Sequence, residues 1–245
     1  MSTEPNSLAS SKSFHPGPVL LLGAPGVGKG TQAKVLMAEF AIPQISTGDL
    51  LRQHRREHTP LGMMADELMQ QGKLVPDDLV NQMVAERLAQ ADCDRGYILD
   101  GFPRTLAQAA WLDDYLERTE SAWPVVVISI RVPYDDLLQR ITGRRICPDG
   151  HIYNIYTQPP RVEGICDVDG KALTQRNDDT EAAFEQRMKE FHELTAPVVP
   201  HYQGQGRFAE VDGLRSVDEV TEAIRTELER LRAQASESIE TAGNR

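Results

Sequence analysis

The fold is decided near the start of the chain, by a stretch that reads Val19-Leu20-Leu21-Leu22-Gly23-Ala24-Pro25-Gly26-Val27-Gly28-Lys29-Gly30-Thr31. Its apolar beginning is typical of a strand buried on both faces of a parallel sheet. The glycines allow a tight turn whose backbone N–H groups approach a phosphate, and a helical pattern follows them. This order predicts a phosphate site in which Lys29 reaches the outer phosphates, the alternative being an ordinary glycine-rich connection. One position departs from the usual pattern, because Gly30 separates the lysine from Thr31.

Composition is that of a globular protein with an acidic surface. The 245 residues carry a formal net charge of −11, with 40% hydrophobic and 26% charged residues. This balance argues against a nucleic-acid partner, although a local arginine cluster would still suit an anionic substrate. The three cysteines are too few for a disulfide framework and favour a reducing, cytoplasmic setting. Neither a signal-peptide core nor an apolar run of about 20 residues occurs, so we expect no membrane partner.

Strand and helix patterns alternate along most of the chain, which predicts an α/β fold. We expect a five-stranded parallel sheet with helices on both faces. Its strands are predicted at 18–22, 43–46, 97–101, 125–130 and 208–211. The carboxyl ends of parallel strands share one edge, where such sheets bind their ligands. The phosphate loop, Thr47 and Asp100-Gly101 should therefore meet at that edge.

Two segments interrupt the alternation and are expected to be inserted, mobile subdomains. Residues 46–75 are charged and helical in pattern, whereas residues 143–179 combine glycine, proline, aromatic residues and two cysteines, which indicates a small β-rich unit. The rest divides into a core domain at 18–45, 76–142 and 180–234, a disordered lead at 1–17 and a flexible tail at 235–245.

Three further motifs accompany the phosphate loop. They read Thr47-Gly48-Asp49-Leu50-Leu51-Arg52, Gly72-Lys73-Leu74-Val75-Pro76 and Gly101-Phe102-Pro103-Arg104-Thr105. In the last of them proline fixes a turn, and the planar guanidinium of Arg104 suits a phosphate. Together these motifs resemble the adenylate kinase family from about Val19 to Ile224, in the family's order and spacing. The resemblance implies a P-loop nucleoside monophosphate kinase that transfers the γ-phosphoryl group of ATP to AMP, giving two ADP.

The resemblance also implies a place for each substrate. For ATP it implies Gly26, Val27, Gly28, Lys29, Gly30, Thr31, Arg144, Ile152, Tyr153 and Arg215. For AMP it implies Thr47, Arg52, Lys73, Leu74, Val75, Gly101, Phe102, Pro103, Arg104, Gln108, Arg176 and Arg187. The catalytic cations it implies around the transferring phosphate are Lys29, Arg104, Arg140, Arg144, Arg176 and Arg187.

Phosphoryl transfer needs in-line positioning and positive charge more than covalent chemistry from the protein. We expect Mg²⁺ as a cofactor, with Asp100 at a strand end as a partner for its water ligands. Water competes as a nucleophile, so both insertions are expected to close before transfer.

Gln108 bears on the choice of base. Its amide offers a donor and an acceptor, which match the N1 and N6 edge of adenine. Uridylate–cytidylate kinases of the same superfamily tend to carry asparagine there, alanine in place of Thr47, and a short lid. The sequence therefore favours a monomeric adenylate kinase of the long-lid type, acting on AMP, ADP and ATP in adenine nucleotide homeostasis. The alternatives are a kinase for another nucleoside monophosphate and, less favoured, a nucleotide-binding regulatory ATPase.

The long lid also carries a candidate zinc site. Cys166-Asp167-Val168-Asp169 has the C-x₂-D form that supplies two zinc ligands in many family members. The first half, Cys147-Pro148-Asp149-Gly150-His151, holds a single cysteine, so His151 or Asp149 would complete a tetrahedral site with Cys147, Cys166 and Asp169. Other members close this lid with a hydrogen-bonded polar quartet and no metal, so both alternatives stay open.

Overall fold

The computed structural model describes residues 14–70, 73–119 and 123–243 of the chain. Its centre is a five-stranded sheet in the order β2-β3-β1-β4-β7. The strands are β1 (Gly17–Leu22), β2 (Gln44–Ser46), β3 (Gly96–Asp100), β4 (Val126–Arg131) and β7 (Phe208–Asp212). All of the pairings are parallel, with β1 between β3 and β4. The predicted five-stranded parallel sheet is therefore confirmed.

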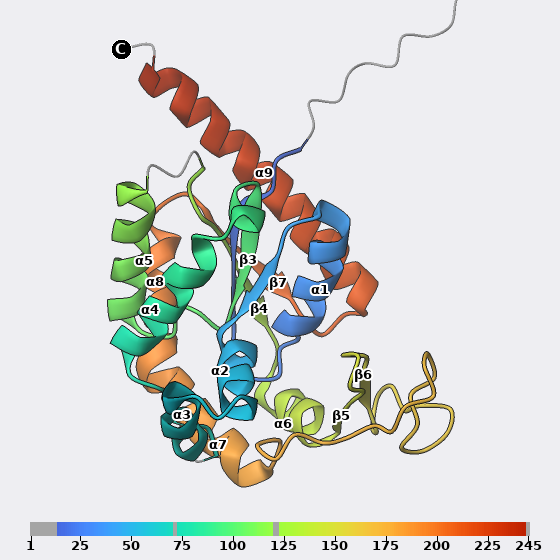
Figure 1. The fold of residues 1–245 in the computed structure, drawn as a ribbon. Coiled ribbons are helices and arrows are strands. Elements are labelled where there is room, and N and C mark those ends of the chain that lie inside the picture. The colour runs from blue at the N-terminus through green and yellow to red at the C-terminus, as the bar shows by residue number, and fades with distance from the viewer. Residues whose placement is uncertain (1–13, 71–72, 120–122, 244–245) are drawn as a thin grey trace, which may run out of the picture.

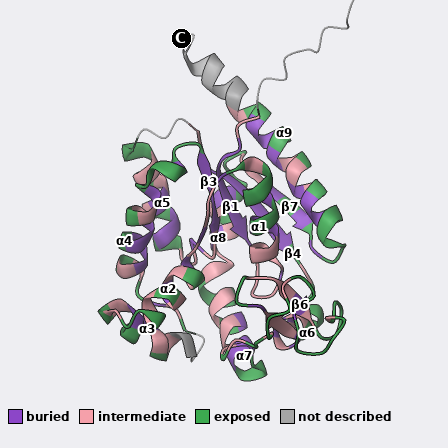
Figure 2. Cartoon of the chain, turned by 45° about the vertical axis from the view of Figure 1, so that its right-hand side comes forward, coloured by how far each residue is buried: buried purple, intermediate pink, exposed green. Residues whose placement is uncertain are grey.

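Helices cover both faces of this sheet (Figure 1). One face carries α1 (Lys29–Phe40) and α9 (Val217–Gly243), and the other carries α4 (Asp77–Leu88), α5 (Leu106–Arg118) and α8 (Val198–Gln203). Side chains of β1 alternate between the two faces, as the pleat of a strand requires. Val19 and Leu21 belong to the buried cluster that includes α1 and α9, and Leu20 and Leu22 belong to the other. Burial on both faces explains why the β1 sequence is continuously apolar (Figure 2).

The two segments that interrupt the alternation lie beyond the carboxyl ends of the strands. The first contains α2 (Thr47–Arg56) and α3 (Pro60–Gln70). The second runs from α6 (Tyr134–Thr142) to α7 (Glu181–Glu190) and contains an antiparallel pair, β5 (Arg144–Ile146) and β6 (Ile152–Asn154). This second segment, called the lid below, is largely exposed and has a small buried cluster of its own, formed by Cys147, Tyr153 and Cys166. The strand pair lies within residues 143–179, the segment for which we expect a β-rich insertion.

Short helical turns complete the connections. η1 (Ala91–Cys93) precedes β3, and η2 (Phe191–Thr195) is a π-helical turn between α7 and α8. None of the helices in the described part of the chain combines the length and apolarity needed to cross a membrane.

The chain ends differ from expectation where the structure describes them. Residues 1–13 of the expected lead lie outside the described residues, but the ring of Phe14 packs 5.3 Å from that of Phe40, and Gly17 already belongs to β1. At the other end α9 continues through Gly243, well past residue 235. The expected disordered lead and flexible tail were therefore too long, because both ends extend regular or packed structure.

Besides its buried apolar residues, the long C-terminal helix is fastened to the sheet by the buried side chain of Arg232. Arg232, 4% exposed, donates hydrogen bonds to the carbonyl groups of Pro16, Pro18 and Pro124, at 2.6, 2.6 and 2.5 Å. These carbonyls flank the amino ends of β1 and β4. The contact ties the end of the chain to the strand that leads into the phosphate loop.

Candidate active site

An open cleft of about 1620 Å³ runs along the carboxyl edge of the sheet. It extends from the phosphate loop and lid to α2 and residues 73–75. A drug-sized ligand fills roughly 300–1,000 Å³. The cleft therefore has room for two nucleotides.

The phosphate loop forms one end of the cleft. Gly28 precedes α1 with φ 103°, a left-handed conformation that favours glycine. No side chain caps the amino end of α1. Such uncapped N–H groups, together with the helix dipole, attract an anion.

Lys29 begins α1 and lies against the loop. Its Nζ donates to the carbonyl groups of Gly23 at 2.7 Å and Ala24 at 3.1 Å. Burial lowers the pKa of Lys29 to about 8, and attraction to Asp100 only partly offsets that effect. The unusual Gly30 has a steric reason, because a Cβ there would lie 3.3 Å from the Asp100 carboxylate.

Arginines converge on the middle of the cleft. Burial, followed by repulsion from neighbouring arginines, lowers the pKa of Arg187 to about 9 and that of Arg176 to about 10. Burial also lowers the pKa of Arg104 and of Arg140. Cations that repel one another in a partly desolvated cleft form a strong site for a polyanion.

Two aspartates that we did not single out from the sequence neutralise part of this charge. The carboxylate of Asp179, whose side chain is 0% exposed, accepts from Arg144 Nε at 2.8 Å and lies 3.8 Å from Arg187. Asp178 forms an ion pair with Arg187. The sequence could have indicated both aspartates, since they directly follow Arg176-Asn177.

A third aspartate joins the lid to α2. Asp49 accepts from Arg52 Nε at 3.1 Å and lies 3.6 Å from Arg176. Burial alone would raise the pKa of Asp49, but the two arginines outweigh it and lower the pKa. The insertions thus approach each other across the cleft.

Most of the predicted nucleotide-binding residues line this cleft. Arg140, at the phosphate-loop end, donates to the carbonyl groups of Val27 at 3.3 Å and Gly213 at 2.8 Å. The other predicted residues on the lining are Gly26, Val27, Gly28, Lys29, Gly30, Thr31, Arg52, Lys73, Leu74, Val75, Gly101, Pro103, Arg104, Arg144, Ile152, Tyr153, Arg176, Arg187 and Arg215.

Three residues predicted for AMP are almost completely buried beside the cleft. Thr47 is buried and donates to the carbonyl of Gly101 at 2.8 Å. Phe102 is fully buried in the apolar core. Gln108 is 2% exposed and is held by neighbouring hydrogen bonds.

The comparisons with known proteins agree with this geometry. A family model described as adenylate kinase matches residues 21–207. The chain belongs to the adenylate kinase family. It is accordingly a phosphotransferase.

Relatives named adenylate kinase match most of the chain. One from Clostridium botulinum (strain Loch Maree / Type A3) is 46% identical over 203 residues, which cover 82% of this chain and 94% of that protein. One from Thermodesulfovibrio yellowstonii is 47% identical over 214 residues, covering 86% and 99% respectively. One from Clostridium novyi is 44% identical over 212 residues, covering 86% and 98%. The likeness thus includes the lid and both ends of the cleft.

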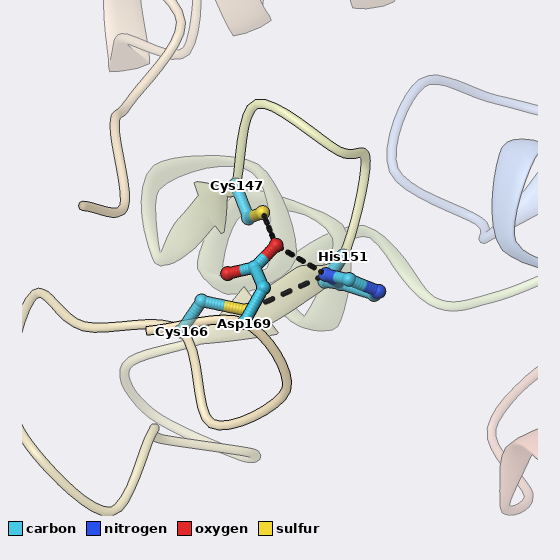
Figure 3. A group of neighbouring side chains, drawn as sticks. All are labelled: Cys147, His151, Cys166 and Asp169. Carbon is cyan, nitrogen blue, oxygen red and sulfur yellow. Dashed lines mark hydrogen bonds and ion pairs between the residues drawn. The ribbon is translucent and has the colours of Figure 1, made fainter. Parts of the chain in front are cut away.

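Within the lid, four potential metal ligands converge (Figure 3). One atom from each of Cys147, His151, Cys166 and Asp169 lies within 4.8 Å of the others. Cys147 Sγ is 2.9 Å from Asp169 Oδ2, and Cys166 Sγ is 3.4 Å from His151 Nδ1. Asp149, the alternative to His151, instead pairs with Lys171 Nζ at 2.7 Å. The structure therefore groups His151 with the other three.

Proposed function

We propose that this protein catalyses the reversible, Mg²⁺-dependent reaction of ATP with AMP to give two ADP, and so balances the adenine nucleotides. The observation that carries the proposal is the cleft itself. Its phosphate loop lies at one end, the segment at residues 73–75 lies at the other, and arginines of α2, of the loop after β3, of α6, of the lid and of α7 line the cleft with them. Few functions other than transfer between two phosphorylated ligands require this arrangement.

In the proposed mechanism, the phosphate loop and Lys29 hold the outer phosphates of ATP. Arg52 and Arg104 hold the phosphate of AMP, and the remaining arginines spread positive charge over the group in transfer. Mg²⁺, when bound, neutralises charge on the phosphates of ATP. Asp100, which accepts from Gln44 Nε2 at 3.0 Å at the end of β3, is the carboxylate we assign to its water ligands.

The remaining assignments follow the sequence prediction with one refinement. ATP is assigned to the loop from Gly26 to Thr31 and to Arg144, Ile152, Tyr153 and Arg215. AMP is assigned to residues 73–75, 101–104 and Gln108. Phe102 is buried and Thr47 bonds to Gly101, so we assign these two a supporting role through the backbone rather than a side-chain contact.

A coupled assay of ATP with each nucleoside monophosphate tests the function. We expect turnover with AMP that exceeds turnover with CMP, UMP or GMP by at least about a hundredfold. Strong turnover with CMP or UMP but not AMP would show a kinase for another monophosphate. ATP hydrolysis without any acceptor would instead indicate a regulatory ATPase.

We further propose that the lid binds structural Zn²⁺ through Cys147, His151, Cys166 and Asp169. Zn–ligand bonds of about 2.0–2.3 Å place tetrahedral ligand atoms roughly 3.3–3.8 Å apart. The distances of 3.4 Å from Cys166 Sγ to His151 Nδ1 and 3.3 Å from His151 Nδ1 to Asp169 Oδ2 match that spacing, whereas the 2.9 Å from Cys147 Sγ to Asp169 Oδ2 is shorter. When bound, the ion would cross-link the two halves of the lid.

Metal analysis and thermal unfolding test the zinc proposal. Protein purified without chelator should contain one zinc per chain, and Cys166→Ser should lose the metal and unfold at a lower temperature. Asp149→Asn and Cys93→Ala are the matched controls and should keep the zinc. A stoichiometry near zero in the wild type would leave the polar quartet as the correct description.

We also propose that the enzyme is a cytoplasmic monomer. The cysteines Cys93, Cys147 and Cys166 are all free thiols, as a reducing compartment favours. The residues of the cleft come from one chain, so the proposed reaction needs no second copy. Sedimentation at catalytic concentration tests the oligomeric state.

A further inference from the structure

The amide of Gln108 is held at both of its ends. Its Oε1 accepts from the backbone N–H of Arg104 at 2.7 Å, and its Nε2 donates to Asp77 Oδ1 at 2.7 Å. The second oxygen of the Asp77 carboxylate accepts from Thr105 Oγ1, also at 2.7 Å. Thr105 in turn caps α5, because its Oγ1 accepts from the N–H of Gln108 at 3.1 Å. Asp77 is therefore part of a closed hydrogen-bond network around Gln108.

This network permits only one orientation of the amide. A glutamine side chain has nearly the same shape when its oxygen and nitrogen are exchanged, so only its partners define which atom is where. Exchange would turn Nε2 toward the Arg104 N–H, a donor facing a donor. It would also turn Oε1 toward the Asp77 carboxylate, an acceptor facing an acceptor. Leaving buried polar groups unpaired in this way is costly.

The orientation decides which purine edge Gln108 would match. Adenine offers an acceptor at N1 and a donor at N6, whereas hypoxanthine offers a donor at N1 and an acceptor at O6. In the observed orientation Gln108 uses one N–H in its bond to Asp77 and one lone pair in its bond from the Arg104 N–H. One N–H and one lone pair therefore remain for a base. The exchanged orientation would suit hypoxanthine instead.

We infer that Asp77 is a specificity-determining positioning residue, which holds the Gln108 amide so that the acceptor site takes adenine and rejects 6-oxopurines. The inference rests on the proposed function, because it assumes that AMP is the acceptor and that Gln108 meets its base. Asp77 itself lies in the first turn of α4 and acts through Gln108 rather than on the nucleotide.

The test compares AMP with IMP as phosphoryl acceptors in the full-length wild type, Asp77→Asn and Asp77→Ala. An asparagine at position 77 can donate or accept, so it can form a hydrogen bond with Gln108 in either orientation. An alanine can form no such bond. Asp78→Asn is the matched control, since Asp78 shares the first turn of α4 and is exposed. Thermal unfolding of each variant establishes that it is folded.

We expect the ratio of kcat/KM for AMP to that for IMP to fall roughly tenfold in Asp77→Asn, with kcat at saturating AMP within about threefold of the wild type. Asp77→Ala should lower the ratio in the same direction, and Asp78→Asn should leave it unchanged. A purely structural role would weaken both acceptors equally, so an unchanged ratio in both Asp77 variants overturns the inference. A wild type that does not phosphorylate AMP overturns the proposed function itself, a result distinct from the first.

Discussion

Several cations of the cleft already have partners from the chain itself, and the partner determines what a substitution removes. Arg187 pairs with Asp178 and lies near Asp179, and neighbouring arginines surround it. Lys29 instead donates to carbonyl groups of the phosphate loop. We propose that Arg187 acts on the phosphate in transfer, whereas the protonation of Lys29 depends on its surroundings.

Replacing Arg187 by methionine should therefore lower kcat more than it weakens nucleotide binding. Loss of one charged donor at a developing charge costs about 10²–10³-fold in kcat. Arg131→Met is the control, because Arg131 is 73% exposed and pairs with Glu210 on the surface. Steady-state kinetics with both substrates varied would measure the effect, and a kcat within threefold of the wild type would contradict the assigned role.

Lys29 should make ATP binding dependent on pH. Its pKa in the free protein is lowered to about 8, so the positive charge is present below pH 8 and is lost as the pH rises. Bound phosphates favour the protonated form, so the Kd for ATP should rise above pH 8, by at most tenfold per pH unit. Calorimetry from pH 7 to 9.5 would show the slope. Lys29→Arg should flatten it, because a guanidinium stays protonated in this range; a wild-type Kd that is flat to pH 9.5 would disprove the assignment.

At the scale of elements, α9 is held to the sheet by Arg232. Replacing Arg232 by methionine removes a donor to three carbonyl groups at the amino ends of β1 and β4. We expect the free energy of unfolding to fall by about 2–4 kcal/mol. Arg230→Met serves as the control on the same helix, because its ion pair with Glu227 is solvent-exposed and should matter by less than about 0.5 kcal/mol. Urea unfolding of both variants measures the difference, and equal losses would rule out a special role for Arg232.

The elements that could be predicted from sequence are those with a strong local pattern. The apolar run of β1 and the glycine-rich turn that follows it both appear as expected. The turn η2 and helix α8 lack such a pattern, since Pro197 and Pro200 interrupt the helical sequence there. Contacts between segments that are far apart in the sequence could not be predicted either. Asp77 meets Gln108 from 31 residues away, and no local pattern reports that contact.

The same limit applies to the site. The phosphate loop and the arginines carry their chemistry in their own sequence, so most of the cleft lining was predicted. The burial of Phe102 could not be predicted. Its motif suggested a contact with AMP, but its ring packs against that of Trp111, with the ring centroids 5.9 Å apart. The lid cysteines were predictable as a group, but only the folded lid distinguishes His151 from Asp149.

At the scale of the whole molecule, the lid touches α1 of the core and α2 of the first insertion at separate points. Lys34 on α1 donates to the carbonyl of Gly150 at 2.6 Å, and Arg176 approaches Asp49 on α2. Both are polar contacts that phosphate can replace, so we expect the two insertions to close further around a bisubstrate inhibitor. Small-angle scattering should show a smaller radius of gyration with that inhibitor than with pyrophosphate, which occupies the loop alone. An unchanged radius would refute closure.

Asp178 and Asp179 have a consequence for how tightly any nucleotide is held. Asp178 and Asp179 already supply counter-charges to Arg144 and Arg187, so a phosphate that approaches these two arginines exchanges one anionic partner for another. The net gain from each arginine is smaller than its charge suggests. Tight ground-state binding would slow an enzyme whose products resemble its substrates. By keeping affinity moderate, this acidic pair favours rapid product release and reaction in both directions.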